Sequence, residues 1–382
     1  MLIVVNTRLL IHDRLDGIGR FTYESLSRIT QKHPDDHFVF LFDRPIHEDF
    51  IFSENITAVK LFPPARRPWL FNIWFNWSVA GVLRDLKPDV FLSPDGFLPA
   101  RTATPCLPVI HDLNFEHYPG DLPPKILRYY KKNFPQFARK GTRVATVSEF
   151  SKNDIAEKYG VDPSRIDVVY NGASAEFLPL TDEIARVVRK KYAQDAPYFL
   201  FVGSLHPRKN VTRLLQAFEI FRKNNDTNLK LLIVGERYWR NFDLNDALEK
   251  MIYKNEVIFT GRVSPDELHR IMGAAHALTY VPYFEGFGIP IVEAMACEVP
   301  VITSNITSMP EVAGEAALLV DPFSAASIAD AMQKIAKDEN LRSELIRKGN
   351  TQREKFSWDR TADLLWESIQ KTCTGDSPNR PT

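Results

Sequence analysis

The sequence predicts an α/β protein built from two facing Rossmann-like domains, each a doubly wound parallel sheet. Short runs of apolar, often β-branched residues alternate with amphipathic helical stretches from one end of the chain to the other. The apolar runs are continuous, as expected for strands covered on both faces. The alternation restarts after the Asn171-Gly172 turn, and 382 residues suffice for two domains.

The expected strands follow in chain order, with helical stretches between them. In the first half they are Leu2–Asn6, Phe38–Phe42, Ile56–Leu61, Val90–Ser93, Leu107–His111, Val144–Ser148 and Ile166–Tyr170. In the second half they are Tyr198–Gly203, Leu229–Gly235, Val257–Thr260, Ala277–Val281, Val299–Thr303 and Ala317–Val320. The first long helix is expected from Phe21 to about residue 31, and Ser264-Pro265-Asp266-Glu267 is a capping box that opens another.

These elements predict four parts of the chain. Residues 1–175 form an N-terminal Rossmann-like domain, and residues 176–355 form a C-terminal Rossmann-like domain. A C-terminal helix over 356–373 packs back on the first domain, and the polar, proline-rich residues 374–382 form a flexible tail. The carboxyl ends of the two sheets are expected to line an interdomain cleft.

Composition excludes several classes of protein. A net charge of zero and a pI near 7.1 argue against a nucleic-acid partner. Three cysteines without metal-type spacing fit a reducing compartment. The chain starts with a short strand pattern broken by Arg8, which is not a signal peptide, and no apolar run approaches the roughly 20 residues of a membrane span. We therefore expect a cytoplasmic protein.

The segment from Glu285 to Glu293 contains the sequence pattern that is most informative about function. It places a glycine-containing loop before Pro290, which suits the first turn of a helix because its missing N–H has no partner there. A helix N-terminus attracts phosphate, and the two flanking carboxylates can accept hydrogen bonds from sugar hydroxyls. This predicts a nucleotide-sugar site, although two loop glycines with a capping Glu explain the same residues equally well.

Other polar residues follow expected strands. Gly203 begins a loop that carries Arg208 and Lys209, two cations suited to a diphosphate. An exposed basic pair on a loop is the alternative interpretation. At the end of another strand stands His111-Asp112, in which the imidazole can contact a sugar hydroxyl while Asp112 orients it; a buried structural pair is equally consistent.

The segment Asp16-Gly17-Ile18-Gly19-Arg20 precedes the first long helix. It lacks the third glycine of the dinucleotide fingerprint. We interpret it as a flexible loop that offers backbone N–H groups to a phosphate, with a plain turn as the alternative.

No metal site is predicted. The sequence has no D-x-D triplet and no cluster of His, Cys or Asp at metal-binding spacing. A departing diphosphate would instead be stabilised by cations and a helix N-terminus. Neither a nucleophile elbow nor a Walker loop occurs, so hydrolase and P-loop functions are not indicated.

Two stretches combine basic and aromatic residues. Arg66-Arg67 precede Trp69, Trp74 and Trp77, and residues 125–143 carry seven basic residues and no acidic one. Such stretches can lie on an anionic membrane surface or hold a lipid-linked acceptor. They can equally be aromatic helix faces that cover a sheet, an interpretation that we favour for the first stretch and leave open for the second.

The chain resembles the retaining glycosyltransferases of glycosyltransferase family 4, which have the GT-B fold. Glu285-Gly286-Phe287-Gly288 through Glu293-Ala-Met-Ala296 is similar to the family's E-x7-E motif, and Pro300–Thr303 and Met309–Val312 are similar to its continuation. The resemblance covers nearly the whole chain. It implies that Glu285, His111 and Lys209 act on the transferred sugar and the diphosphate, with Glu293 on the ribose.

The resemblance also implies that the N-terminal domain is the acceptor-side domain, that the C-terminal domain binds the nucleotide-sugar donor, and which residues make the remaining donor contacts. They come from the cationic loop, from the backbone after Glu285, from the Gly17–Gly19 loop and from the base-binding backbone: Gly17, Gly19, Gly203, Arg208, Arg262, Val263, Gly286, Phe287, Gly288 and Ile289. Many members have Gly-Arg where this chain has Gly203-Ser204, so one expected cation is absent and Arg208 takes its place. No cofactor or metal is implied beyond the nucleotide-sugar substrate.

The local sequences around Gly17 and Lys209 most resemble those of the mannosyltransferase-type branch of the family. The resemblance therefore implies GDP-mannose as the donor, with a UDP-sugar as the alternative, and a glycan or lipid-linked saccharide as the acceptor. The expected product is a polysaccharide, O-antigen or glycolipid made at the inner face of the membrane, which the protein would touch peripherally. A nucleotide-sugar epimerase on the same fold and a non-catalytic nucleotide-sugar-binding subunit are the competing hypotheses.

Overall fold

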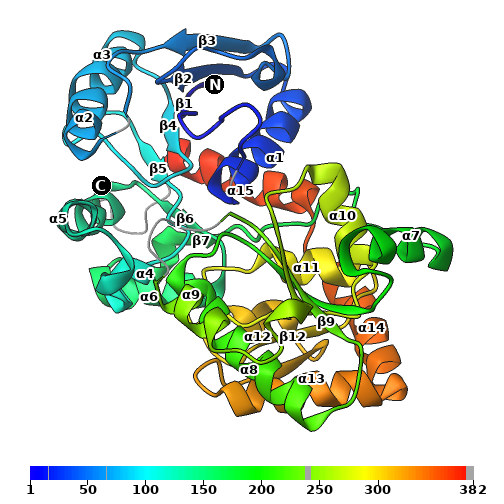
Figure 1. Ribbon diagram of the computed structural model, residues 1–382. Coiled ribbons are helices and arrows are strands. Elements are labelled where there is room, and N and C mark those ends of the chain that lie inside the picture. The colour runs from blue at the N-terminus through cyan, green and yellow to red at the C-terminus, as the bar shows by residue number, and fades with distance from the viewer. Residues whose placement is uncertain (16, 66, 237–241, 376–382) are drawn as a thin grey trace. The chain divides into compact units, whose positions relative to one another are not determined.

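The computed structural model describes residues 1–15, 17–65, 67–236 and 242–375 (Figure 1). The chain forms two compact units. Unit 1 comprises Met1–Asn171 together with Trp358–Thr382, and unit 2 comprises Gly172–Ser357. Unit 2 is therefore one continuous segment, whereas unit 1 is assembled from both ends of the chain.

The sheet of unit 1 has five parallel strands in the order β3-β2-β1-β4-β5. Their bounds are β1 Leu2–Asn6, β2 His37–Phe42, β3 Ile56–Lys60, β4 Val90–Ser93 and β5 Cys106–Pro108. Beyond β5 the chain changes partner, because Val109 N donates to Ser93 O whereas Ile110 N donates to Ala145 O. A second, two-stranded sheet of β6 (Val144–Thr146) and β7 (Ile166–Val168) follows there.

Helices accompany this sheet. They are α1 Gly17–Lys32, α2 Pro68–Ile73, the π-helical turn η2 Trp74–Val79, α3 Ala80–Leu86, α4 Asn114–His117, α5 Pro124–Lys140, α6 Glu149–Tyr159 and α15 Trp358–Thr374, with 3-10 turns η1 Glu48–Phe50, η3 Pro119–Asp121 and η4 Pro163–Arg165. The strands β1, β2, β4 and β5 are largely buried, with Val4, Phe40 and Phe91 fully inaccessible to solvent, whereas the edge strand β3 is half-exposed. Continuous apolar strands thus lie in the core, as the sequence pattern predicts.

The C-terminal helix α15 packs on α1 and on the strands β4 and β5 of unit 1. Leu365 and Ile369 are fully buried in this contact. Trp366 stacks on His33 with ring centroids 3.7 Å apart, and Asp363 accepts a hydrogen bond from Lys32 at 2.7 Å. Apolar burial and aromatic stacking therefore hold the last helix to the first part of the chain.

The sheet of unit 2 has six parallel strands in the order β10-β9-β8-β11-β12-β13. The bounds are β8 Tyr198–Val202, β9 Lys230–Val234, β10 Val257–Gly261, β11 Ala277–Tyr280, β12 Val301–Ser304 and β13 Ala317–Val320. Counted from β8, this is the 3-2-1-4-5-6 order of the Rossmann fold. In that order the strand sequence reverses between β8 and β11.

Eight α-helices lie among the described residues of unit 2. They are α7 Asp182–Ala193, α8 Val211–Asn224, α9 Phe242–Glu249, α10 Pro265–Gly273, α11 Ile289–Ala296, α12 Met309–Ala313, α13 Ala325–Lys337 and α14 Glu339–Arg353, with 3-10 turns η5 Pro207–Lys209 and η6 Lys254–Glu256. The expected capping box is confirmed, since Ser264 Oγ accepts from Glu267 N at 3.2 Å. Among the described ranges, no helix has the length and apolarity required to cross a bilayer.

Every expected strand is present, with ends that differ by a few residues. One expectation about a loop is wrong. The Gly17–Gly19 segment, predicted to be a flexible loop before a helix that begins at Phe21, forms the first turn of α1. Both glycines fit the helical conformation, because the low propensity of glycine is a cost of only about 1 kcal/mol per residue that tertiary contacts can offset. Asp16 and residues 376–382 of the predicted tail lie outside the described residues.

Candidate functional site

The loops that follow β8 and β11 form a polar centre in unit 2. Ligands of open α/β sheets bind beyond the carboxyl ends of the strands at the point where strand order reverses, and β8 and β11 are the strands on either side of that point. Lys209 Nζ lies 2.5 Å from Glu285 Oε2 and donates a hydrogen bond to the hydroxyl of Tyr280 at 2.6 Å. Two residues that are 76 positions apart in the sequence are thereby paired.

Arg208 adds a second cation to this centre. Its Nη1 lies 3.7 Å from the same carboxylate oxygen of Glu285. The side chains of Arg208, Lys209 and Glu285 are 23%, 12% and 13% exposed, so all three are partly withdrawn from water yet still reachable. Two cations facing one carboxylate leave a local positive surplus, which suits an anionic ligand such as a diphosphate.

The loop that carries these cations is anchored by Asn210. This residue is buried and has a left-handed backbone conformation with φ 64°, which Asn tolerates better than most residues. Its side-chain amide donates to Val281 O at 3.0 Å and to Pro322 O at 2.7 Å. In addition, Tyr283 N donates to Arg208 O at 3.0 Å. The loops after β8 and β11 are therefore held together through their backbones.

The loop from Glu285 leads directly into helix α11. Gly288 is the N-cap residue of this helix with φ 95°, and a side chain there would lie 2.8 Å from the terminal methyl group of Met309. Ser308 Oγ fixes the loop by donating to Glu285 O at 2.8 Å. The backbone angle favours glycine here, and any larger residue would also have to displace the Met309 side chain. The first turn of α11 consequently begins four residues after Glu285, whose carboxylate contacts Lys209.

The remaining E-x7-E residues surround this helix start. Gly286 and Phe287 are buried, Ile289 is half-buried as the first residue of α11, and Pro290 lies in the first turn. Glu293 is half-buried in the next turn. Burial and then the neighbouring Glu293 carboxylate raise the pKa of the Cys297 thiol to about 12, so this cysteine stays protonated and is not a nucleophile.

The carboxyl ends of three neighbouring strands are glycines. Gly203 follows β8, Gly235 follows β9 and Gly261 ends β10, each with a positive φ. A Cβ at Gly235 would lie only 1.9 Å from Gly203 O, so two backbones meet where no side chain fits. Beyond Gly261, Arg262 is exposed and Val263 half-buried, which leaves this backbone accessible at the same edge of the sheet.

In unit 1, His111 is held by a backbone carbonyl. Its Nε2 lies 2.8 Å from Pro94 O, and its ring packs edge-on against Phe21 of α1 at 5.0 Å. Since a carbonyl only accepts, Nε2 carries the proton, and in the neutral ring Nδ1 is the acceptor nitrogen. Asp112, expected to orient the ring, uses Oδ1 to accept from Asn114 N at 3.0 Å.

A buried ion pair in unit 1 was not predicted from the sequence. The pair occupies the position that Lys209 and Glu285 have in unit 2, because Arg8 follows β1 and Asp95 follows β4, the two strands where the order reverses. Arg8 Nε donates to Asp95 Oδ2 at 2.5 Å, and its guanidinium lies 4.6 Å from the ring centre of Phe97. The only sequence signal was Arg8 itself, which interrupts an apolar run.

Tyr280 was also missed. It ends β11, its ring is 1% exposed, and its hydroxyl reaches Lys209 Nζ. An apolar strand pattern accommodates a tyrosine without any indication that its hydroxyl has a partner. Tyr280 therefore orients the lysine of this centre from within the core.

The first aromatic stretch divides between core and surface. Trp74 and Phe75 are buried, as the core interpretation predicts, whereas Trp69 and Trp77 are 58% and 78% exposed. Phe62, nearby in sequence, is 80% exposed. Arg66 lies outside the described residues.

The second basic–aromatic stretch lies in α5. Its Phe134 and Phe137 are buried, and its exposed residues include the cations Lys125, Arg128, Lys131, Lys132, Arg139 and Lys140.

Two family models match the chain and cover separate halves of it. Residues 15–177 match Glycosyltransferase Family 4, and residues 185–352 match Glycosyl transferases group 1.

Curated relatives align over most of the chain. O-antigen chain mannosyltransferase B of Escherichia coli is 30% identical over 305 residues, which are 80% of this chain and 77% of that protein. The serotype-specific mannosyltransferase WbdA of Escherichia coli is 26% identical over 74% of this chain but only 36% of its own length. The chain thus spans about a third of WbdA.

Solved structures share the fold at low identity. WaaG, a glycosyltransferase involved in lipopolysaccharide biosynthesis, superimposes with a TM-score of 0.75 at 15% identity, over 97% of this chain and 99% of that chain. Anabaena HepE, solved in complex with UDP-glucose, superimposes with a TM-score of 0.75 at 15% identity over 97% of this chain and the whole of the other. The predicted GT-B architecture of two Rossmann-like domains is confirmed.

Proposed function

The chain belongs to glycosyltransferase family 4, and we propose that it is a retaining hexosyltransferase that moves mannose from GDP-mannose to a saccharide acceptor. The observation that carries the proposal is the meeting of Lys209 and Glu285 at the strand reversal of unit 2, next to the start of α11. Cations, a carboxylate and a helix N-terminus are the three groups that a sugar joined to a diphosphate requires.

The diphosphate would bind to the cationic side of this centre. Lys209 and Arg208 neutralise it, and backbone N–H groups of Gly286 to Ile289 donate to its oxygens. Because both cations already face the Glu285 carboxylate, the donor would replace one anionic partner by another. These groups give the departing diphosphate its charge compensation without a metal ion.

Two carboxylates, backbone groups and one imidazole would bind the sugar, the ribose and the base of the donor. Glu285 accepts from hydroxyls of the transferred sugar, and Glu293 accepts from the ribose. The backbone at Gly203 and at Arg262-Val263 receives the base. From unit 1, His111 would contact the transferred sugar. The first turn of α1, with Gly17 and Gly19, would approach the phosphates.

In the reaction, the bond from the anomeric carbon to the diphosphate oxygen breaks and a bond from the acceptor oxygen forms. The acceptor hydroxyl attacks from the face that the diphosphate leaves, so the anomeric configuration is retained, and its proton departs on the diphosphate. No side chain of the described centre is assigned as a covalent nucleophile. Catalysis rests on positioning and on charge stabilisation.

Mannose is supported by the names of the relatives. O-antigen chain mannosyltransferase B and WbdA are mannosyltransferases, and the first acts on an O-antigen chain. The alternative donor, a UDP-sugar, is supported by the UDP-glucose complex of HepE, which shares only the fold. We therefore place GDP-mannose first and a lipid-linked or glycan chain as the acceptor, as in lipopolysaccharide assembly.

The test is a panel of nucleotide sugars, each with and without saccharide acceptors, with released nucleotide and product both measured. Release of GDP that depends on the acceptor, with an α-linked product from the α-linked donor, supports the proposal. A changed sugar without any acceptor identifies an epimerase instead. Binding of nucleotide without turnover on any pair identifies a non-catalytic subunit.

A variant tests the site itself. Lys209→Ala removes a cation from the diphosphate site, and a charge-assisted hydrogen bond is worth roughly 1.5–3 kcal/mol. Donor affinity should therefore fall about 10- to 100-fold, measured by calorimetry with the nucleotide sugar. Lys223→Ala is the matched control, because Lys223 is an exposed lysine at the far end of α8 that pairs with Glu219. Equal affinity of the Lys209 and Lys223 variants would contradict the site assignment.

We also propose that unit 1 touches the membrane that carries the acceptor. Trp69, Ile73 and Trp77 follow one another at four-residue intervals with large exposed areas, and α2 packs against the basic helix α5. Exposed indole rings and cations are the pair of features that bind anionic lipid surfaces. Neither feature has another role in the proposed reaction.

Vesicle co-sedimentation tests this contact. Vesicles with anionic lipid should pellet the protein, whereas neutral vesicles should pellet less. The double variant Trp69→Ser and Trp77→Ser should lose most of the bound fraction. Phe323→Ser, which removes a half-exposed ring from unit 2, is the control and should bind like the original chain. Unchanged binding of the tryptophan variant would contradict the proposal.

A further inference from the structure

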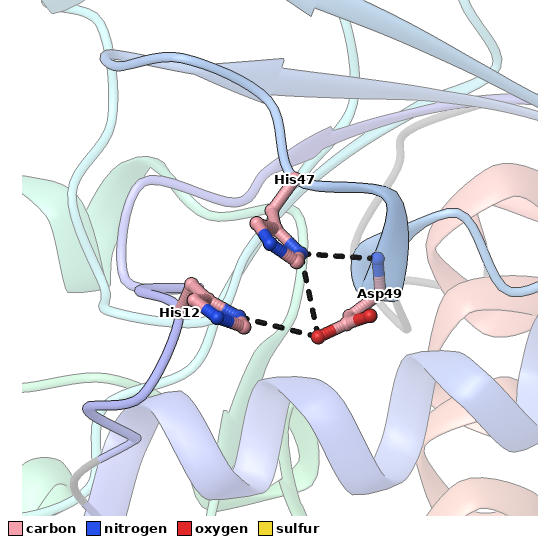
Figure 2. A group of neighbouring side chains, drawn as sticks. All are labelled: His12, His47 and Asp49. Atoms are coloured by element: carbon pink, nitrogen blue, oxygen red, sulfur yellow. Dashed lines mark hydrogen bonds and ion pairs between the residues drawn. The ribbon is translucent and has the colours of Figure 1, made fainter.

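We propose that His12, His47 and Asp49 bind one divalent transition-metal ion of the zinc type. One ligand atom from each residue lies within 4.8 Å of the other two (Figure 2). His12 lies in the loop after β1, and His47 and Asp49 lie at the 3-10 turn η1 after β2. Because β1 and β2 are parallel neighbours, both loops leave the same edge of the sheet. The two histidines are 35 positions apart in the sequence, so a search for metal-ligand spacing does not find the group.

The distances fit a shared ion better than direct hydrogen bonds. Asp49 Oδ2 lies 3.2 Å from His12 Nδ1 and 3.3 Å from His47 Nδ1. Hydrogen bonds between a cationic nitrogen and a carboxylate are about 2.7–2.9 Å long. A tetrahedral ion with bonds of about 2.0–2.1 Å separates its ligand atoms by about 3.3–3.4 Å, the edge of the tetrahedron. Both observed distances lie near that edge.

The hydrogen bonds of His12 and His47 bear on whether their Nδ1 atoms carry a proton. His47 Nδ1 accepts from Asp49 N at 3.4 Å, so in this arrangement that nitrogen carries no proton. His12 Nε2 faces Asp13 Oδ2 at 3.2 Å, and a neutral ring that donates there has an unprotonated Nδ1. Two unprotonated ring nitrogens then lie 3.2 and 3.3 Å from one carboxylate oxygen. A cation relieves the repulsion among these atoms, and a carboxylate behind a ligating imidazole is the usual support of a metal ligand.

The two rings must turn to reach one ion. They are stacked with centroids 3.6 Å apart and planes 13° from parallel, which points their lone pairs side by side. Their side chains are 42% and 38% exposed, so rotation about the Cβ–Cγ bonds is unobstructed by a packed core. Binding would exchange the stack for two metal–nitrogen bonds.

The ligand set selects the class of ion. Two imidazoles and a carboxylate suit zinc and neighbouring transition metals, whereas magnesium and calcium prefer oxygen ligands throughout. Three protein ligands leave a fourth position for water or for a group of a bound molecule. The ion would tie the loop before α1 to the loop before β3. None of the three ligands is among the residues proposed to bind the donor, so the proposal does not rest on that function.

Calorimetry of the metal-free full chain with zinc chloride tests the site. One equivalent of zinc per chain is expected, together with a higher unfolding temperature at saturation, while magnesium chloride produces neither. His12→Ala and His47→Ala should each abolish the equivalent and the temperature shift, and Asp49→Asn should weaken binding at least tenfold. His37→Ala is the matched control, since His37 is an exposed histidine of β2 bonded to Thr57.

Three results would overturn the proposal. They are the absence of stoichiometric zinc binding by the original chain, a full equivalent bound by the double variant His12→Ala and His47→Ala, and a cobalt spectrum with an intense thiolate band. The last would place the ion on a cysteine. Circular dichroism of each metal-free variant distinguishes a lost ligand from a lost fold.

Discussion

The close approach of Gly203 and Gly235 gives the sharpest test of the described geometry. Both glycines end strands of unit 2 with nearly equal backbone angles, φ 145° and 148°. A Cβ built on Gly235 would lie 1.9 Å from Gly203 O and 2.7 Å from its carbonyl carbon. A Cβ on Gly203 would meet nothing nearer than Phe201 Cζ at 3.6 Å. The two alanine substitutions therefore share a backbone penalty, and only one adds a collision.

The magnitudes follow from these contacts. A non-glycine residue in a sparsely populated backbone region costs about 1–3 kcal/mol, which applies to both Gly203→Ala and Gly235→Ala. Overpacking costs about 1–3 kcal/mol more, and here the obstructing atom is backbone that cannot rotate away. We expect Gly235→Ala to lower the free energy of unfolding by about 2–6 kcal/mol. It should also weaken donor binding, because Gly203 begins the loop that carries Lys209.

Urea unfolding of the full chain, followed by far-UV circular dichroism, measures the difference. Hydrogen exchange of the amides in β8 and β9 then shows whether the loss is local to these strand ends. Gly203→Ala is the reference in both measurements. If the two variants are equally stable, the backbone contact between β8 and β9 is not as close as described, and the reasoning fails.

Three further predictions concern buried polar side chains. Tyr280→Phe should weaken donor binding by about 0.5–1.5 kcal/mol, a few-fold in dissociation constant, because Lys209 loses the hydroxyl that orients it; titration with nucleotide sugar measures this. Burial lowers the pKa of His276 to about 4, so as the pH falls the unfolded chain takes up a proton at this histidine before the folded chain does. Up to about 3 kcal/mol of the free energy of unfolding is therefore lost between about pH 6.5 and pH 4. Urea titrations should show this loss in the original chain and not in His276→Leu. Burial would raise the pKa of Asp167, but hydrogen bonds led by Arg143 lower it overall, so the stabilisation from this carboxylate is present above about pH 4 and lost at lower pH. Asp167→Asn should cost about 3–5 kcal/mol at pH 7 in the same assay, because the buried Arg143 loses its charged partner.

The fold was predictable because its strands are long apolar runs. Tyr198–Val202 reads as a strand from its side chains alone, and the structure buries all five of its residues. That Lys209 and Glu285 lie at the carboxyl ends of strands follows from the same pattern. Lys209 and Glu285 touch because β8 and β11 are neighbouring strands. Strand order is set by the crossover connections, and the local sequence at either residue does not indicate it.

The features that the sequence did not reveal depend on long-range contacts or on fine local geometry. Arg8 and Asp95 pair only because β1 and β4 are adjacent. Trp74 and Trp77 both lie in the π-helical turn η2, yet Trp74 is buried and Trp77 is exposed, and an aromatic-rich sequence has no period that predicts such a turn. Gly17 was assigned to a flexible loop that offers backbone N–H groups to a phosphate, yet the structure places it in the first turn of α1, where tertiary contacts can offset the low helix propensity of glycine.

The return of α15 to unit 1 has a consequence for how the protein is made. A ribosome completes all of unit 2, Gly172–Ser357, before it reaches Trp358. Until then the core of unit 1 lacks Leu365 and Ile369, and the surface of α1 that α15 covers has no partner. The half of the nascent chain that emerges first is thus the half that finishes folding last, and during that interval it presents an apolar surface for a chaperone to cover.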